Sequence, residues 1–267
     1  MQKTIPFYPT LGQSWVLTAF FLGASLVVSG IVAIIQLVTG TPSTGSLVTL
    51  IAYILPFFFL WLFITVRSLI PPGPQAPFAA MVFPPKGRPL TWGLFAWLLF
   101  FTPLLPILVE PLTNWIPMPE FMQNAFANMF RRDFVSFVMV AVAAPVCEEW
   151  LCRGIIARGL LRHTTPAKAI LWSAFIFALI HLNPWQAVPA FVIGLFLGYV
   201  YWKTRSLLPC IFIHFVNNGF SFFLLYLFPD MDVNASTQDI VGDKYWLLYI
   251  MAAVTAGYIG YIIKKRL

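Results

Sequence analysis

Charged residues are scarce in this sequence. Asp, Glu, Lys and Arg make up only 9% of its 267 residues, whereas soluble globular domains carry about 25%. So few charges cannot cover a water-facing surface, which excludes an ordinary soluble domain. The 60% of hydrophobic residues and the mean hydropathy of +0.85 indicate that lipid surrounds most of the chain.

Cysteines are few, and long basic tracts are absent. The three cysteines, Cys147, Cys152 and Cys210, lie in or beside apolar runs. An odd, sparse set makes no disulfide framework, so we interpret them as small buried residues. The formal net charge is +7, but the basic residues are scattered between apolar runs and form no nucleic-acid-binding tract. We therefore expect membrane lipid as a partner, and no nucleic acid.

The sequence is dominated by long apolar runs. At about 20 residues per crossing, they predict an all-α, polytopic transmembrane helix bundle of about eight spans, forming a single membrane domain over residues 1–267. The first run lasts about 25 residues, longer than a signal-peptide core, so we interpret it as a retained span. The expected spans are Ser14–Val38, Leu47–Val66, Thr91–Val109, Phe134 to about Cys147 (extended by a helical run, Glu148–His163), Ala167–Leu182, Trp185–Trp202, Ser206–Phe228 and Tyr245–Ile263.

Two stretches between the spans have their own character. A proline-rich connector, Ser68–Leu90, follows the second span, and Pro103 and Pro106 predict a kink in the third. Within Glu110–Asp133, apolar side chains recur at helical spacing and polar side chains fall between them, which predicts a short amphipathic helix at the membrane interface. Its apolar face would be formed by Met122, Phe126, Met129 and Phe130.

The distribution of Lys and Arg predicts the orientation. If eight spans follow a cytoplasmic N-terminus, the inside segments hold 12 basic residues and the outside segments hold 3, which are Arg131, Arg132 and Lys244. Cytoplasmic loops are enriched in Lys and Arg, so we expect both termini in the cytoplasm and a multi-pass protein of the cell membrane, specifically the bacterial inner membrane. The inside set is Lys3, Arg67, Lys86, Arg88, Arg158, Arg162, Lys168, Lys203, Arg205, Lys264, Lys265 and Arg266.

Ionisable residues inside a membrane are costly and are functional candidates by default. Glu148 and Glu149 are the only acids outside the outer segments. Glu149 and Arg153 are four residues apart, so they share a helix face and can neutralise each other. Glu148 points about 100° away around the helix. The spacing therefore predicts one structurally paired carboxylate and one spare carboxylate suited to general-base chemistry.

Two further apolar segments carry histidines. Phe177 and His181 are four residues apart, and so are His214 and Asn218. Polar side chains on separate spans satisfy one another most easily by meeting in the core of the bundle. We therefore expect these segments to meet the glutamates, with a motif-bearing core at about residues 134–228. The depth of these residues along their predicted spans favours a buried cavity reached from the cytoplasmic half.

The three segments together resemble the motifs of the CAAX protease and bacteriocin-processing (CPBP) family of intramembrane proteases, which includes the Abi proteins and the type II CAAX prenyl proteases. Glu148, Glu149 and Arg153 match Glu-Glu-x-x-x-Arg. The other two motifs, Phe-x-x-x-His and His-x-x-x-Asn, are matched by the pairs named above. The resemblance covers Glu148–Asn218 and implies an all-α bundle of about eight spans.

The resemblance also implies roles. Glu148 and His181 would activate the water that attacks a peptide bond, and His214 and Asn218 would stabilise the oxyanion. Glu149 and Arg153 would support them. The implied enzyme is an intramembrane endopeptidase acting on a membrane-associated peptide or protein. Zinc held by Glu148, His181 and His214 is compatible with these residue types, and so is a glutamate base without metal; we favour the metal-free form.

Three other functions fit parts of the pattern. A non-catalytic membrane binding or bacteriocin-immunity protein could keep the same scaffold. A proton-coupled carrier also places Glu and His inside the membrane, but many transporters contain a repeat that pairs two halves of the chain, and we find none here. A cysteine protease using Cys147 or Cys152 would need a neighbouring group that favours the thiolate, and only Arg153 is near in sequence.

Overall fold

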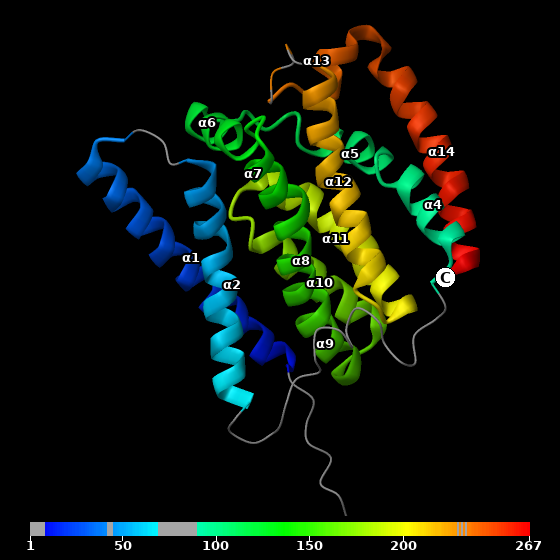
Figure 1. Cartoon of the computed structure of the whole chain (residues 1–267). Helices are drawn as coiled ribbons and strands as arrows, with labels where there is room; N and C mark the ends of the chain where they lie inside the picture. The colour runs from blue at the N-terminus through cyan, green and yellow to red at the C-terminus, as the bar shows by residue number, and fades with distance from the viewer. Residues whose placement is uncertain (1–8, 42–44, 69–89, 229, 231, 233) are drawn as a thin grey trace, which may run out of the picture.

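The computed structural model describes residues 9–41, 45–68, 90–228, 230, 232 and 234–267, and these residues form helices and no strand (Figure 1). The all-α prediction is therefore confirmed for this part of the chain. Lys3, Lys86, Arg88 and nearly all of the proline-rich connector lie outside the described residues. The main helices are α1 (Leu11–Thr39), α2 (Ser46–Ser68), α4 (Trp92–Phe101), α5 (Leu104–Val109), α6 (Glu120–Met129), α7 (Phe134–Phe137), α8 (Ala144–Glu149), α9 (Arg158–His163), α10 (Pro166–Leu179), α11 (Pro184–Thr204), α12 (Leu208–Leu227), α13 (Thr237–Val241) and α14 (Tyr245–Arg266).

The number of membrane crossings differs from the prediction. Six helical runs in the described residues are long and apolar enough to cross a membrane, and a seventh crossing is possible if α4 and the helical stretch Leu104–Leu112 form one bent span. The bend is 40° and falls at Pro103, as the prolines predicted. The expected fifth span is α10, which has 14 residues. At 1.5 Å per residue it is about 21 Å long and cannot cross a hydrocarbon core of about 30 Å.

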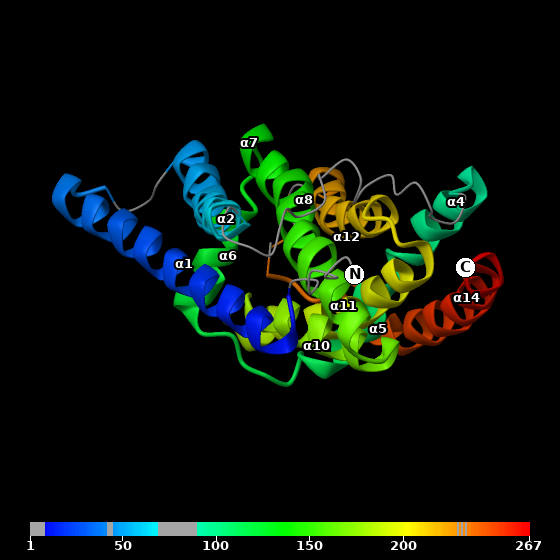
Figure 2. The same ribbon diagram turned by 90° about the horizontal axis from the view of Figure 1, so that it is seen from below.

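The helices alternate in direction, so both ends of the described chain lie at the same end of the bundle as α9 (Figure 1). Pro9, just before α1, packs closely on Gly159 of α9. A Cβ atom at position 159 would lie only 2.4 Å from the nearest atoms of Pro9. The Arg266 side chain, at the end of α14, covers Gly93 at the start of α4. Seen from this end, α1 and α2 flank one side of the central helices and α4 and α14 the other (Figure 2).

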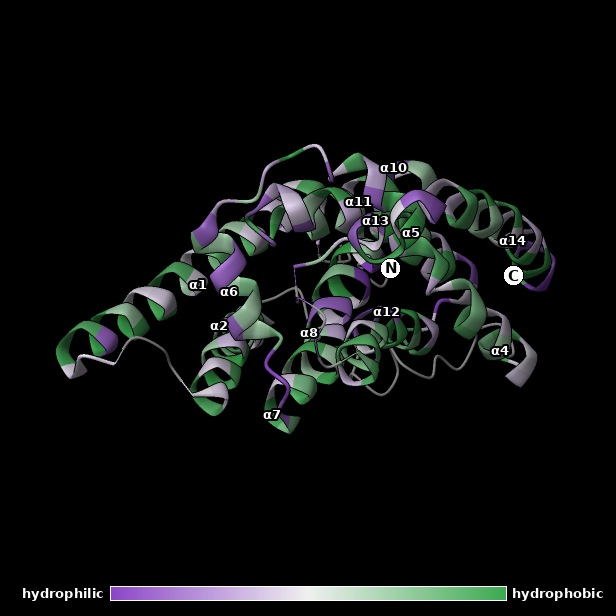
Figure 3. Cartoon of the chain, turned by 90° about the horizontal axis from the view of Figure 1, so that it is seen from above, coloured by the Kyte–Doolittle hydropathy of each residue, from purple (hydrophilic) through white to green (hydrophobic). Residues whose placement is uncertain are grey.

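The outer faces of the bundle are apolar. Large side chains such as Leu37 and Trp92 are 84% and 91% exposed, and hydrophobic residues dominate the outer helices α4 and α14, whereas α6 and the central α8 carry hydrophilic ones (Figure 3). Exposed apolar faces on this scale are stable only against lipid. The chain is a multi-pass membrane protein, as its composition predicted.

The predicted amphipathic helix is present as α6. Met122, Phe126, Met129 and Phe130 are partly buried, and most other residues of the helix are exposed. The helix lies at the end of the bundle opposite α9, beside the start of α7 (Figure 1). This apolar face packs toward α2 and α12, where Phe130 contacts Phe222 with ring centroids 5.3 Å apart.

The central helical run is Phe134–His163, 30 residues long, and it contains two π-helical segments, η2 (Val138–Ala143) and η3 (Trp150–Ala157). The expected fourth span was placed at Phe134 to about Cys147, which put Glu148 near its inner end. The expected extension of this helix through Glu148–His163 is confirmed, and Glu148 therefore lies in the middle of the 30-residue run. Wide π turns often occur at functional sites, and here they enclose the six residues of α8 that include both glutamates.

Asp133 joins the first turn of this run to α2. Its carboxylate accepts hydrogen bonds from the Ser136 backbone N–H (2.9 Å) and from the Ser46 hydroxyl (2.6 Å). The hydrogen bond from Ser46 is the main reason that the pKa of Asp133 is lowered from its ordinary value. A carboxyl with a lowered folded-state pKa stabilises the fold above its ordinary pKa, and that contribution is lost as the pH falls through the folded-state value.

We expect Asp133→Ala to reduce the free energy of unfolding by about 1 kcal/mol, because an N-cap is lost. Asp133→Asn keeps a capping oxygen and should lose only the charge-dependent part. Thermal unfolding in detergent at pH 7 should therefore rank wild type above Asp133→Asn and Asp133→Asn above Asp133→Ala. The gap between wild type and Asp133→Asn should shrink below pH about 3.9; a gap that grew in acid would contradict the assignment.

Candidate active site

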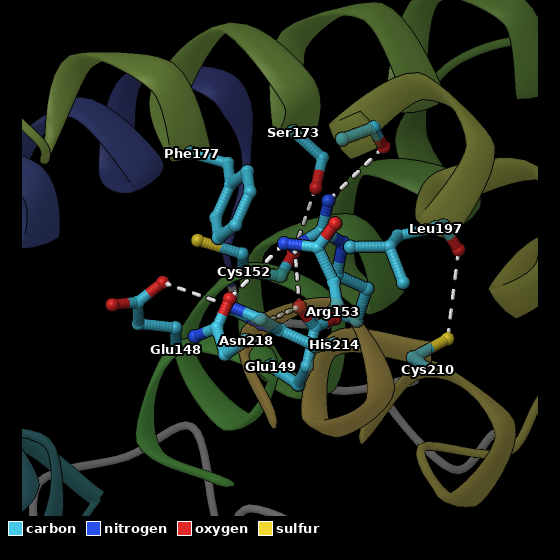
Figure 4. Close-up of polar contacts among 12 residues, drawn as sticks. Glu148, Glu149, Cys152, Arg153, Ser173, Phe177, Leu197, Cys210, His214 and Asn218 are labelled. Carbon is cyan, nitrogen blue, oxygen red and sulfur yellow. Dashed lines mark hydrogen bonds and ion pairs between the residues drawn. The ribbon is translucent and has the colours of Figure 1, made fainter. Parts of the chain in front are cut away.

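The predicted paired carboxylate is confirmed by the geometry. The Arg153 guanidinium donates to Glu149 Oε1 at 2.9 Å, and both side chains are completely buried. A second guanidinium nitrogen donates to the backbone carbonyl of Gly194 on α11 at 3.0 Å. Arg153 also lies 4.4 Å from the ring centre of Phe177. The pair is thus enclosed by α8, η3, α10 and α11 (Figure 4).

His214 extends this network toward the spare glutamate. Its Nδ1 lies 3.0 Å from the same oxygen of Glu149 that Arg153 binds. A carboxylate paired with Arg153 can only accept, so Nδ1 of His214 carries the proton and donates. The other ring nitrogen, Nε2, then lies 3.9 Å from Glu148 Oε2. Glu149 therefore fixes which nitrogen of His214 points at Glu148.

His181 reaches Glu148 from the end of α10, where the structure differs from the expected helix. The backbone N–H of His181 bonds to Ala178 rather than to Phe177, so the helical ladder stops and the Phe177 carbonyl is released. The His181 ring satisfies that carbonyl through Nδ1 at 2.7 Å. Its Nε2 lies 3.9 Å from Glu148 Oε2. Leu182, which follows, has the unfavourable φ of 56° in the turn that leads to α11.

Phe177 is therefore more than a spacer in its motif. Its ring makes edge-on contacts with the rings of both His181 and His214, at centroid distances of 5.1 and 5.6 Å. Because the same ring contacts Arg153, it lies among the guanidinium and the two imidazoles. The phenyl group holds both imidazoles in place, and its residue's carbonyl orients one of them.

Asn218 is positioned by a backbone carbonyl of the central helix that lacks its helical hydrogen bond. The Ala144 N–H bonds to Met139 in the π-helical segment η2, and the next residue, Pro145, has no N–H. The Val140 carbonyl is thus left without its helical donor, and Asn218 Nδ2 bonds to it at 2.8 Å. An amide nitrogen carries two hydrogens, so one N–H of Asn218 remains for a substrate oxygen.

Glu148 is the residue on which these groups converge. Its Oε1 accepts a hydrogen bond from the Tyr53 hydroxyl of α2 at 2.5 Å, and its Oε2 is buried without a hydrogen-bond partner. The predicted spare carboxylate is therefore present, with two imidazole nitrogens facing its free oxygen. Sequence reasoning missed Tyr53, because one tyrosine in an apolar span carries no motif that relates it to a glutamate 95 positions later.

These groups line a cavity of about 560 Å³. Its wall includes Glu148, His181, His214 and Asn218, and it continues past Asn217 and Ser221 of α12 to Asn128, Met129 and Phe130 at the α6 end. The depth argument favoured a cavity reached from the half that carries the basic residues, whereas many of the lining residues lie between Glu148 and the α6 end.

The metal hypothesis can be tested against the spacing. Both imidazoles hold Nδ1–H on an oxygen and turn Nε2 to a carboxylate, which suits the chemistry of zinc ligands. Two ligands of one tetrahedral zinc ion lie about 3.4 Å apart, whereas each Nε2 is 3.9 Å from Glu148 Oε2. Among the described residues, no group of three or more His, Cys, Asp or Glu side chains is arranged to hold a metal ion. The residue types fit zinc, and this arrangement of them does not.

The cysteine hypothesis fits the geometry poorly. Cys152 and Cys210 are completely buried, and the thiol of Cys210 contacts the Leu197 carbonyl at 3.5 Å. Neither thiol lines the cavity, and Cys147 is also absent from its wall.

Arg153→Met should destabilise the protein by about 3–5 kcal/mol, because Glu149 would remain buried without its guanidinium. The double variant Arg153→Met/Glu149→Gln removes both charges and keeps an oxygen for His214. We expect it to regain part of the loss. Thermal unfolding in detergent provides the measurement, and a single variant that melts like wild type would show that the pair contributes nothing.

The site can now be compared with known proteins. Residues 130–220 match the family described as type II CAAX prenyl endopeptidase Rce1-like. The matched stretch runs from the end of α6 into α12 and contains all seven motif residues. No curated protein and no solved structure matches the chain. The resemblance that the three motifs predicted is confirmed over residues 130–220, where this multi-pass membrane protein is similar to the type II CAAX prenyl endopeptidase Rce1-like family.

Proposed function

We propose that the protein is an intramembrane endopeptidase that hydrolyses a peptide bond of a membrane-associated peptide or protein. One observation carries the proposal. Glu148 Oε2 is buried without a partner on the wall of the cavity, and the Nε2 atoms of two histidines face it at 3.9 Å each. Atoms at this separation are too far apart for a direct hydrogen bond, and one water molecule can bridge them.

Glu148 and His181 would activate that water. The Phe177 carbonyl holds the proton of His181 on Nδ1, so the lone pair on Nε2 can accept one hydrogen of the water while Glu148 Oε2 accepts the other. The oxygen lone pair is then directed away from both acceptors, toward a bound carbonyl carbon. As the water oxygen bonds to that carbon, its proton moves to Glu148.

His214 and Asn218 would stabilise the oxyanion that forms. Asn218 offers its second amide N–H. His214 donates from Nε2 only as an imidazolium, because Nδ1–H is bonded to Glu149, and the carboxylate of Glu149 lies beside the ring to stabilise that charge. When the carbon–nitrogen bond breaks, Glu148 returns the proton to the departing amine, and the products are a carboxylic acid and an amine.

Tyr53 and the Glu149–Arg153 pair would support the chemistry without touching substrate. The Tyr53 hydroxyl holds one oxygen of Glu148, which leaves Oε2 alone to meet the water. The name of the family refers to prenylated CAAX proteins. For this chain we propose the wider class of membrane-associated peptides and protein termini, since prenylated proteins are not expected in the bacterial inner membrane.

Glu148→Gln should reduce cleavage of a membrane-peptide library at least about 1,000-fold, because the amide cannot accept the proton. The residue keeps its size and an oxygen for Tyr53, so unfolding in detergent should change little. His181→Ala should behave similarly. Full activity in both variants, with unchanged folding, would overturn the proposal.

The same preparation decides the role of metal. Cleavage that depends on Glu148, persists in a chelator and accompanies no stoichiometric metal by elemental analysis would support the metal-free base. Cleavage lost with the chelator and restored by zinc would replace it with a metalloprotease. If no peptide is cleaved under any condition, the non-catalytic binding or immunity function becomes the better explanation.

Asn218→Ala should lower kcat by about 10²–10³-fold, the effect of removing one oxyanion donor, with a much smaller change in KM. Ser221→Ala is the matched control, because Ser221 lines the same cavity three residues further along α12. Equal losses in both variants would argue for a general effect on packing rather than for a specific donor at position 218.

A further inference from the structure

The cavity that contains the site is closed at one end. On the side nearer α9, the layer next to Glu148 consists of Glu149, Cys152 and Arg153, and Leu197 and Leu60 lie in the same closed packing; all five are 0% exposed. No atom of this layer lines the cavity. Water and substrate therefore cannot reach Glu148 from the α9 end without disrupting the buried Glu149–Arg153 pair.

At the other end the wall continues to the interfacial helix. Every helix that lines the cavity contributes residues from the part that lies on the α6 side of the glutamates or level with them. Examples are Gln36 near the end of α1, Thr49 near the start of α2, and Gln186 at the start of α11. The cavity thus runs from Glu148 to the α6 end of the bundle.

The two ends differ in charge. At the α9 end the described residues include nine Lys and Arg and no acid, whereas the α6 end has three Lys and Arg and seven acids. These counts cover the described basic residues except Arg153, and all acids except Glu148 and Glu149. Basic ends of membrane proteins face the cytoplasm. The α9 end set is Arg67, Arg158, Arg162, Lys168, Lys203, Arg205, Lys264, Lys265 and Arg266; the α6 end set is Glu110, Glu120, Arg131, Arg132, Asp133, Asp230, Asp232, Asp239, Asp243 and Lys244.

The wall also restricts what can bind. Apart from Glu148 and the two histidines, the lining residues are apolar or carry neutral amide and hydroxyl groups. Among the described residues, the lining contains no Lys or Arg to pair with a free carboxylate and no second acid to pair with a basic side chain. Neutral amides such as Asn217, Gln186 and Gln36 can instead bond to the backbone of an extended peptide.

From the closed floor, the charge difference and the neutral wall, we infer that substrate enters from the non-cytoplasmic side, at the α6 end. The substrate is an uncharged, largely apolar segment at the outer border of a membrane protein's span. The inference rests on the proposed endopeptidase function, because only an enzyme has a substrate. The direction from which the cavity is reached can be measured without turnover.

The test uses single cysteine substitutions and a membrane-impermeant maleimide, applied to intact spheroplasts of a bacterial expression host and to the same cells after permeabilisation. Ser221→Cys reports on the cavity wall. Asn124 of α6 and Lys168 of α10 are exposed, so Asn124→Cys and Lys168→Cys report on the two ends of the bundle. Wild type, whose Cys152 and Cys210 are buried, gives the background.

We expect Asn124→Cys and Ser221→Cys to be labelled in intact spheroplasts, and Lys168→Cys only after permeabilisation. Labelling of Lys168→Cys but not of Asn124→Cys in intact spheroplasts would overturn the orientation. Labelling of Ser221→Cys only after permeabilisation, together with Lys168→Cys, would overturn the direction of access, and so would its complete protection. None of these outcomes depends on cleavage, whereas normal activity of Glu148→Gln would overturn the proposed function and leave the labelling result intact.

Discussion

A buried charge in a membrane must be neutralised where it lies, and the arrangement of this site follows from that constraint. Arg153 and Glu149 neutralise each other in a layer with no exposed surface. Glu149 is committed to Arg153 and His214, whereas the neighbouring Glu148 points about 100° away around the helix and keeps one oxygen without a hydrogen-bond partner. One glutamate thereby lies in the closed layer, and the other faces the cavity as the group that we propose to be reactive.

The remaining site residues are held by backbone carbonyls that the helices leave free. Pro145 and the π-helical segment η2 expose the carbonyl of Val140 to Asn218. The end of α10 exposes the carbonyl of Phe177 to His181. In lipid an unpaired carbonyl costs several kcal/mol, so each side chain is fixed by a group that requires a partner. Irregular helix geometry is therefore what positions the polar groups here.

Much of this could be predicted from the sequence, and the exceptions have physical reasons. Apolar runs identify helices, and four-residue spacing predicts the Glu149–Arg153 pair, because both follow from local helix geometry. The end of α10 before His181 could not be predicted, since Ile180 and Leu182 continue an apolar pattern through a tight turn. The continuous helix from Phe134 to His163 was predicted, but the depth of Glu148 in the membrane was not, because hydropathy does not show where the membrane-crossing part of a continuous helix ends. The contact from Tyr53 depends on tertiary packing alone.

The contact of Tyr53 with Glu148 joins the proposed site to a helix outside the family match. The stretch that matches a known family begins at residue 130, yet one oxygen of Glu148 is held by a hydroxyl from α2, far outside that stretch. The stretch that can be recognised as similar to a family is thus smaller than the set of residues that meet at the proposed site. A chain with the same central helices but another residue in place of Tyr53 would hold the same glutamate differently, and the proposed reactivity would change with it.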